Sequence, residues 1–92
     1  MSGKRAAGKI SVDHHWEAVA VANECRDAGY HVVEIWDGRY MDAGFCVTVR
    51  RAFPADLDMD AAGEAVCAQL NPIADHHGGL LWQVDIHDID LM

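Results

Sequence analysis

The sequence predicts an α+β sandwich in which two helices cover one face of a four-stranded antiparallel sheet. Hydrophobic residues alternate with polar ones in several short segments, two longer segments carry a helical stripe, and turn signals separate them in the order β-α-β-β-α-β. A chain of 92 residues is enough for one hydrophobic core and too short for two. Because the helices follow the first and third strands, the economical arrangement is ferredoxin-like, with sheet order 4-1-3-2. A different α+β sandwich of the same elements is the alternative.

The first strand and helix are predicted from residues 9–28, so that residues 1–8 are expected to form a flexible basic N-terminus. Ile10 and Val12 alternate with Ser11, and Asp13 is a suitable N-cap for a helix beginning near residue 14. Gly29 is a typical left-handed helix stop. The small residues of the helical stripe favour close packing on a sheet; they are Ala18, Val21, Ala22, Cys25 and Ala28.

Two strands joined by a hairpin are predicted next, over residues 30–36 and about 45–50. In the first, Val33 and Ile35 share one face, and Val32, Glu34 and Trp36 share the other. Asp37-Gly38 marks the turn. In the second strand the half-buried alternation places three residues on the core face, which are Phe45, Val47 and Val49.

A second helix is predicted to begin at Asp58 or Asp60 and to end at Gly78-Gly79. Pro72 is expected to kink it or to restart it, because proline lacks a backbone N–H. Its apolar stripe comprises Met59, Ala62, Val66, Leu70 and Ile73, with His77 as a further candidate.

The last strand is predicted to end near residue 87, so that the single domain spans residues 9–87 and residues 88–92 form a tail. Its alternation assigns one set of side chains to the core and the next to the opposite face. The core set is Leu80, Trp82, Val84 and Ile86, and the other set is Leu81, Gln83, Asp85 and His87.

The charge distribution favours a protein partner over nucleic acid. The net charge is −8, and from Ser11 onward four arginines face all 15 acidic residues, which gives −11. Such a surface repels phosphate backbones and attracts basic proteins. The alternative is that the acidic residues only keep a small protein soluble.

The remaining composition predicts a cytoplasmic protein. Its three cysteines, Cys25, Cys46 and Cys67, are odd in number and form no CxxC pair, which is typical of reduced thiols. The sequence contains no apolar run long enough for a membrane span and nothing that resembles a signal peptide.

The catalytic inventory is poor, and we expect that the protein is not an enzyme. Nucleotide-binding, zinc-protease and nucleophile-elbow motifs are missing from the sequence. The hydroxyl residues are only Ser2, Ser11 and Thr48, and the lysines only Lys4 and Lys9. Neither the hydroxyl residues nor the lysines have a neighbour at a spacing in the sequence that would activate them as nucleophiles.

Histidine is the exception to this scarcity of catalytic side chains, because the chain contains six histidines. The tripeptide Asp-His-His occurs twice, at residues 13–15 and 75–77. In the predicted topology both copies lie at the same end of neighbouring strands. Their imidazoles are candidate ligands for Zn, Ni or Cu, and no other cofactor is expected. A proton-sensitive surface and ordinary loop residues are the alternatives. The candidate metal ligands are His14, His15, His76 and His77.

Exposed aromatic residues and neighbouring acids form the candidate partner-binding site. Trp16 lies off the apolar stripe of its helix, where a large aromatic side chain is suited to contact a partner or to cover the sheet edge. The candidate contact residues are Trp16, Trp36, Asp37, Tyr40 and Asp42.

The sheet face opposite the helices is a second candidate surface, for a homodimer or a protein partner. We expect this face to mix apolar and polar residues and to be more apolar than a fully solvated sheet face needs to be. The alternative is the ordinary scatter of apolar residues on a surface. The residues expected there are Val32, Trp36, Cys46, Thr48 and Leu81, among Glu34, Arg50, Gln83 and Asp85.

Two segments between Ala18 and Trp82 are Cys25-Arg26-Asp27-Ala28-Gly29-Tyr30-His31-Val32 and Phe45-Cys46-Val47-Thr48-Val49-Arg50. In these segments the chain resembles the RraB-like family, whose members bind and inhibit ribonuclease E. The resemblance extends to Leu70, to Ile73-Ala74-Asp75-His76-His77-Gly78-Gly79 and to Trp82, although only Leu80-Leu81 intervene where the family has Tyr-Asp-Gly. The resemblance implies a ferredoxin-like fold and a regulator that binds a nuclease.

Together these observations predict a small acidic regulator that binds a protein partner, such as a nuclease or another nucleic-acid enzyme with a basic surface. A phage-type inhibitor of a host defence nuclease has the same composition. A histidine-based metal-binding protein or sensor is the alternative of a different class.

Overall fold

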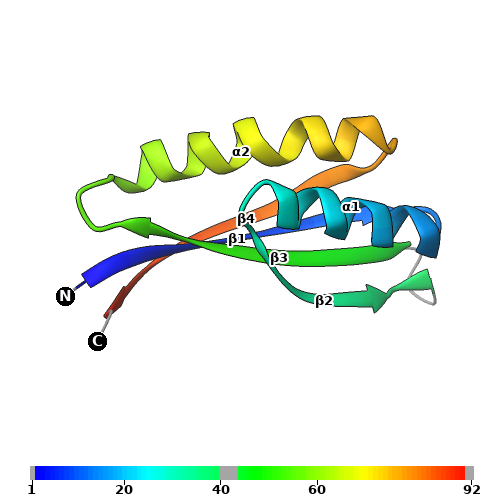
Figure 1. Cartoon of the computed structure of the whole chain (residues 1–92), viewed down its shortest axis with the longest axis horizontal. Coiled ribbons are helices and arrows are strands. Elements are labelled where there is room, and N and C mark those ends of the chain that lie inside the picture. Colours follow the sequence, from blue (N-terminus) through cyan, green and yellow to red (C-terminus); the bar gives the residue numbers. More distant parts are fainter. Residues whose placement is uncertain (1, 40–43, 91–92) are drawn as a thin grey trace.

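The fold is ferredoxin-like, as the sequence predicts. A computed structural model describes residues 2–39 and 44–90. The sheet order is β2-β3-β1-β4, and each neighbouring pair is antiparallel (Figure 1). No helix in the described ranges is both long and apolar enough to cross a membrane. The elements are β1 (Ser2–Val12), α1 (His15–Asp27), β2 (His31–Asp37), β3 (Phe45–Pro54), α2 (Met59–His76) and β4 (Leu80–Asp90).

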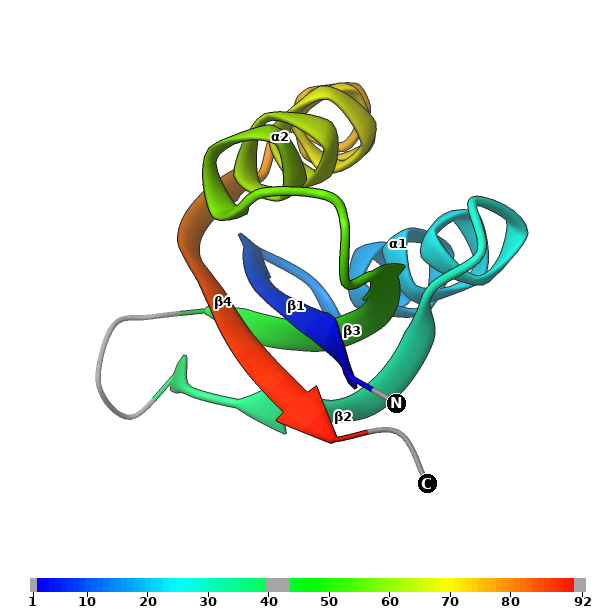
Figure 2. The same cartoon turned by 90° about the vertical axis from the view of Figure 1, so that its left-hand side faces the viewer.

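The hydrophobic core lies between the sheet and the two helices, which cover the same face (Figure 2). Ile10, Val47 and Val49 project from the central strands, and Leu70 and Val66 meet them from α2. The predicted small-residue stripe of α1 is confirmed, since Ala18, Val21, Ala22 and Cys25 are buried and Ala28 packs against them. Burial of each large aliphatic side chain here contributes about 1.5–3 kcal/mol.

The expected flexible N-terminus is wrong, because residues 2–8 form most of β1. β1 is paired along both of its edges over this length. The pairing begins with Ser2 opposite Asp90 of β4 on one edge and with Gly3 opposite Pro54 of β3 on the other. Ala6 is fully buried, and Gly8 lies so close to Leu70 that a β-carbon would crowd its Cδ1 atom. These small core residues lack the bulky alternation that marks a strand in a sequence. The same pairing extends β4 to Asp90, into the expected C-terminal tail.

The helix boundaries follow the prediction in part. Asp58 caps α2 and accepts a 2.7 Å hydrogen bond from the Ala61 backbone N–H, whereas the N-cap of α1 is His14 rather than Asp13. α2 continues through Pro72 without the expected restart. Met59 is exposed, because the buried stripe of α2 has a regular spacing of four that excludes it; this stripe is Ala62, Val66, Leu70 and Ala74.

A β-bulge reverses the predicted faces at the start of β4. Lys9 pairs with Gln83 while the next residue, Ile10, pairs with Leu81, so Trp82 is an extra residue in the strand. Leu81 therefore packs against the core in phase with Val84 and Ile86. Leu80 and Trp82 are 63% and 48% exposed, which corrects their assignment to the core and that of Leu81 to the opposite face.

A second bulge has the same effect in β2. Val32 pairs with Val49 and Glu34 with Thr48, which leaves Val33 as the extra residue. Val32 consequently packs against the core and not on the opposite face, and Val33 is exposed. Trp36 and Glu34 keep their predicted side.

Candidate functional site

Two adjacent histidines and one glutamate converge where the C-terminus of α2 meets α1. The His76 Nδ1 atom lies 3.1 Å from the Glu24 Oε1 atom, and the His77 Nε2 atom contacts the other carboxylate oxygen, Oε2. The two imidazole centroids are 4.7 Å apart. One ligand atom from each residue lies within 4.8 Å of the other two. The three side chains are therefore close enough to share one cation.

The end of α2 fixes the two imidazoles. His76 is the last helical residue and His77 is the C-cap. Gly78 then adopts a positive φ of 64°, which a residue with a side chain rarely adopts, and the Gly79 N–H donates to the Ala74 carbonyl over 2.8 Å. Because the backbone leaves the helix here, neighbouring side chains that would diverge in an extended segment both reach Glu24.

The environment keeps Glu24 ionised. The hydrogen bond with His77 lowers the pKa of Glu24 below its ordinary value of 4.5; partial burial opposes this effect and the bond with His76 adds to it. The carboxylate is thus a ready hydrogen-bond acceptor or metal ligand at neutral pH.

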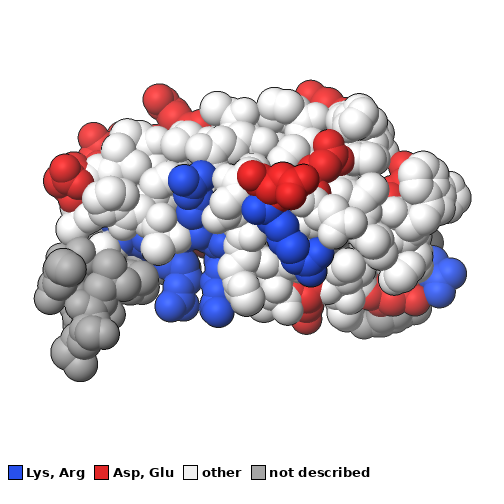
Figure 3. All heavy atoms as spheres, in the orientation of Figure 1, with Lys and Arg blue, Asp and Glu red and all other residues white. Residues whose placement is uncertain are grey.

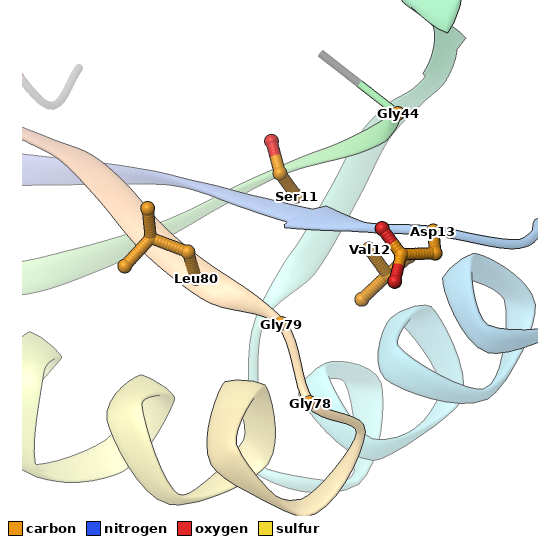
Figure 4. Close-up of a pocket in the computed structure, with 7 residues that line it drawn as sticks. All are labelled: Ser11, Val12, Asp13, Gly44, Gly78, Gly79 and Leu80. Carbon is orange, nitrogen blue, oxygen red and sulfur yellow. The ribbon is translucent and has the colours of Figure 1, made fainter. Parts of the chain in front are cut away.

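The two Asp-His-His segments reach the same end of the sheet, but only the second joins this cluster. A cavity of about 220 Å³ is lined by Asp13 of the first segment and by Gly78 and Gly79, which directly follow the second (Figure 4). His14 instead stacks on Trp16, with centroids 6.4 Å apart, and His15 meets the edge of Phe45. The structure therefore separates the predicted quartet of metal ligands and supplies Glu24 in place of His14 and His15.

The candidate partner-binding residues are spread over two surfaces. Trp16, at the first turn of α1, is 66% exposed, and Trp36 lies on the sheet face opposite the helices. Asp37 is paired with Arg39 at 2.8 Å, and that hydrogen-bonded pair lowers the pKa of the Asp37 carboxyl to about 2. Tyr40 and Asp42 lie outside the described residues.

A cavity of about 310 Å³ lies on the sheet face opposite the helices, hereafter the open face. Trp36 of β2 and Trp82 of β4 contribute indole rings from the two edge strands. The Lys9 ammonium lies 5.6 Å from the centroid of the Trp82 ring. The other lining residues are Glu34, Cys46 and Thr48.

Charge is segregated between the two layers. The helices and the loop before α2, residues 15–27 and 55–76, contain eight acidic residues and one arginine, which is −7 of the total −8. The space-filling view shows carboxylates mainly over the helices and at the ends of the molecule, whereas a group of cations lies below α2 over the strands (Figure 3). The acidic surface is thus the helical layer and not the surroundings of Asp37, whose carboxylate is paired with Arg39.

Sequence reasoning missed two participants in these sites. Glu24 directly precedes the buried Cys25, and its role depends on how α1 packs against α2, which no local pattern encodes. Trp82 was assigned to the core because the bulge that turns it outward has no marker such as glycine or proline.

The fold thus defines a ferredoxin-like α+β protein with a Glu-His-His cluster on one layer and a cavity between tryptophans on the other. No family model and no curated protein matches the chain. Among solved structures, the chain is similar to part of a formyltetrahydrofolate deformylase from Burkholderia mallei, with 22% identity and a TM-score of 0.44. The likeness covers 94% of this chain and 28% of the deformylase, and at this level it identifies no function.

Proposed function

We propose that this protein is a small cytoplasmic regulator that binds a protein partner with a basic surface, such as a nuclease, through its acidic helical layer. The observation that carries the proposal is the concentration of −7 of the −8 net charge on that layer. Exposed acidic residues on a rigid scaffold accelerate encounter with basic proteins and can occupy a groove that otherwise holds nucleic acid. Trp16 supplies an exposed aromatic anchor on the same layer.

Three further observations support this proposal. The described part of the chain holds three free cysteines, which suits a reducing compartment. The sequence has few hydroxyl and lysine nucleophiles. Its resemblance to RraB-like proteins points to ribonuclease E, or a related nuclease, as the partner.

The test measures association with purified ribonuclease E and inhibition of its RNA cleavage. Glu64, exposed on α2, and Glu34, exposed on β2, offer a matched pair of charge reversals. We expect Glu64→Lys to slow association with ribonuclease E several-fold. The dependence of the association rate on salt should flatten as salt rises, because electrostatic steering of the encounter is screened over about 8 Å at physiological ionic strength. Glu34→Lys changes the net charge equally and should have a smaller effect. Equal effects of the two reversals would assign the steering to overall charge and not to the helical layer.

Divalent metal binding is the second candidate function, favoured by the convergence of His76 and His77 on Glu24. Two imidazole nitrogens and a carboxylate form a donor set that Zn²⁺ accepts in proteins, and Ni²⁺ also accepts imidazole. The cluster without metal is equally an interhelical hydrogen-bonded contact, which becomes an ion pair when an imidazole is protonated, and the two roles respond to pH in opposite ways. Protonation of the imidazoles strengthens the ion pair but removes the lone pairs that a metal requires.

Calorimetric titration of untagged protein with ZnCl₂ distinguishes the two roles. If the cluster binds zinc, the wild type should bind one ion, binding should weaken as the pH falls from about 7.5 to about 5.5, and His77→Ala should lose it. The His14→Ala, His15→Ala double variant is the control, since neither residue belongs to the cluster, and its binding should match the wild type. A wild type that takes up no zinc at micromolar concentrations would reduce the cluster to an ion pair.

A further inference from the structure

We propose that the cavity between Trp36 and Trp82 binds a free nucleotide, with the base between the indole rings and the phosphate on the neighbouring cations of the open face. This site lies on the opposite side of the sheet from the acidic helical layer. It is therefore independent of the protein-binding surface proposed above.

The walls of the cavity suit a planar aromatic group. Trp36 stands on β2 opposite Cys46, and the β4 bulge turns Trp82 toward the same space. Both rings are partly exposed, at 37% and 48%, so that they present surface to a ligand instead of filling a core. Indole rings stack on any nucleobase, because every base has a π face.

The floor of the cavity supplies groups that can hydrogen-bond a base edge. Glu34, Thr48, Lys9 and Gln83 form a row of paired positions across all four strands. A carboxylate, a hydroxyl and an ammonium from this row line the cavity. They offer both donors and acceptors at one level of the sheet.

The open face is locally cationic in a molecule of net charge −8. Arg50 follows the buried Val49 and lies opposite Ala7, and Arg5 precedes the buried Ala6, so both arginines share the face of Lys9. Among the positions whose exposure is described, the acidic residues paired onto this face are Glu34 and Asp85. His31 lies opposite Arg50 and His87 opposite Arg5. An anionic group next to the cavity would therefore meet positive charge.

Size and long-range charge favour a free nucleotide over a nucleic-acid strand. A volume of about 310 Å³ is at the small end for ligand pockets, which start at about 300 Å³. A strand that crosses the molecule would bring many phosphates toward a net charge of −8, and this repulsion grows with every phosphate added.

Titration with AMP, adenosine and inorganic phosphate, followed by tryptophan fluorescence and calorimetry, tests the proposal. We expect AMP to quench fluorescence saturably, adenosine to bind at least about fivefold more weakly, and phosphate alone to leave the fluorescence unchanged. Trp82→Ala should weaken AMP binding by about tenfold or more, because one stacking wall is lost. Arg50→Gln should weaken binding of AMP but not of adenosine, because Arg50 is exposed on the open face but does not line the cavity. Trp16→Ala is the matched control on the helical layer and should bind AMP like the wild type.

Three outcomes would overturn the proposal. One is the lack of saturable binding by AMP, GMP, CMP and UMP at concentrations up to about 10 mM, which corresponds to the weakest specific affinities. Another is an equal loss of affinity in Trp16→Ala and Trp82→Ala. The third is an adenine hexanucleotide that binds more tightly than AMP, which would make the face a single-strand site. Circular dichroism establishes that each variant is folded, and Trp82→Phe, which retains a stacking ring, should recover part of the affinity.

Discussion

Cys25 and Cys67 differ in how far the fold withdraws their thiols from solvent. Cys25 is fully buried under α1, and this burial, with a smaller contribution from the negative charge of Glu24, raises the pKa of its thiol from 9.0 to about 11. Cys67 is only partly buried on α2. Because the thiolate is the reactive form, iodoacetamide at pH 8 should alkylate Cys67 well before Cys25, as followed by mass spectrometry. In urea both cysteines should react at similar rates; preferential reaction of Cys25 in the folded protein would contradict this packing.

The raised pKa of Cys25 also affects stability at high pH. A thiol that ionises less readily in the folded state than in the unfolded state favours folding only while it is protonated. Its contribution is complete below pH 9 and is lost as the pH rises toward about 11. Cys25→Ala should therefore flatten the loss of thermal stability between these values, and an unchanged slope would show that another group controls it.

Glu24 produces the opposite pH dependence, because its pKa is lowered on folding by His77 and His76. The stabilisation is present above pH 4.5, the ordinary carboxyl value, and disappears as the pH falls through the lower value of the folded state. Glu24→Gln should therefore melt below the wild type at pH 7, and the difference should shrink as the pH is lowered below 4.5. A difference in melting temperature that does not change as the pH is lowered would mean that the carboxylate charge is not responsible.

At the scale of elements, the two glycines Gly79 and Gly63 should respond to alanine in opposite directions. A β-carbon on Gly79 would lie 2.6 Å from the Ser11 backbone oxygen, whereas nothing lies within 4 Å of one on Gly63 in α2. Gly79→Ala should lower the free energy of unfolding by about 1–3 kcal/mol through forced separation of the α2–β4 turn from β1. Gly63→Ala should raise it by about 0.5–1 kcal/mol, since alanine is the better helix former. Urea denaturation measures both changes, and a neutral Gly79→Ala would show that the turn can move away from β1.

Local patterns identified the elements well and their faces less well. The stripe of α1 and most of the stripe of α2 could be read from residue spacing, a helix cap at Asp58 or Asp60 from residue type, and the sheet order from the order of the elements. The bulges at Val33 and Trp82 could not, because each reverses the alternation within a strand of ordinary composition. For the candidate sites, the sequence singled out His76, His77 and Trp36, but Glu24 and Trp82 join them only through the packing of separate elements.

At the scale of the whole molecule, the concentration of negative charge on one layer should make stability depend on salt. Repulsion among the carboxylates of α1 and α2 is reduced when the screening length shortens from about 30 Å at 0.01 M to about 8 Å at 0.15 M ionic strength. The melting temperature should therefore rise over this range of NaCl. Glu64→Lys should reduce the dependence more than Glu34→Lys does, because Glu34 already faces the cations of the open face. A melting temperature that falls with salt would indicate that the ion pairs outweigh the repulsion.

The central position of β1 has a consequence for how the protein is made. This strand leaves the ribosome before its partners β3 and β4, which begin at Phe45 and Leu80. At a synthesis rate of about 5–20 residues per second, β1 waits several seconds for its last neighbour. Until then the strand has an unpaired edge that a chaperone or another nascent chain can occupy. Cooperative folding of this sheet is therefore an event that follows translation of β4.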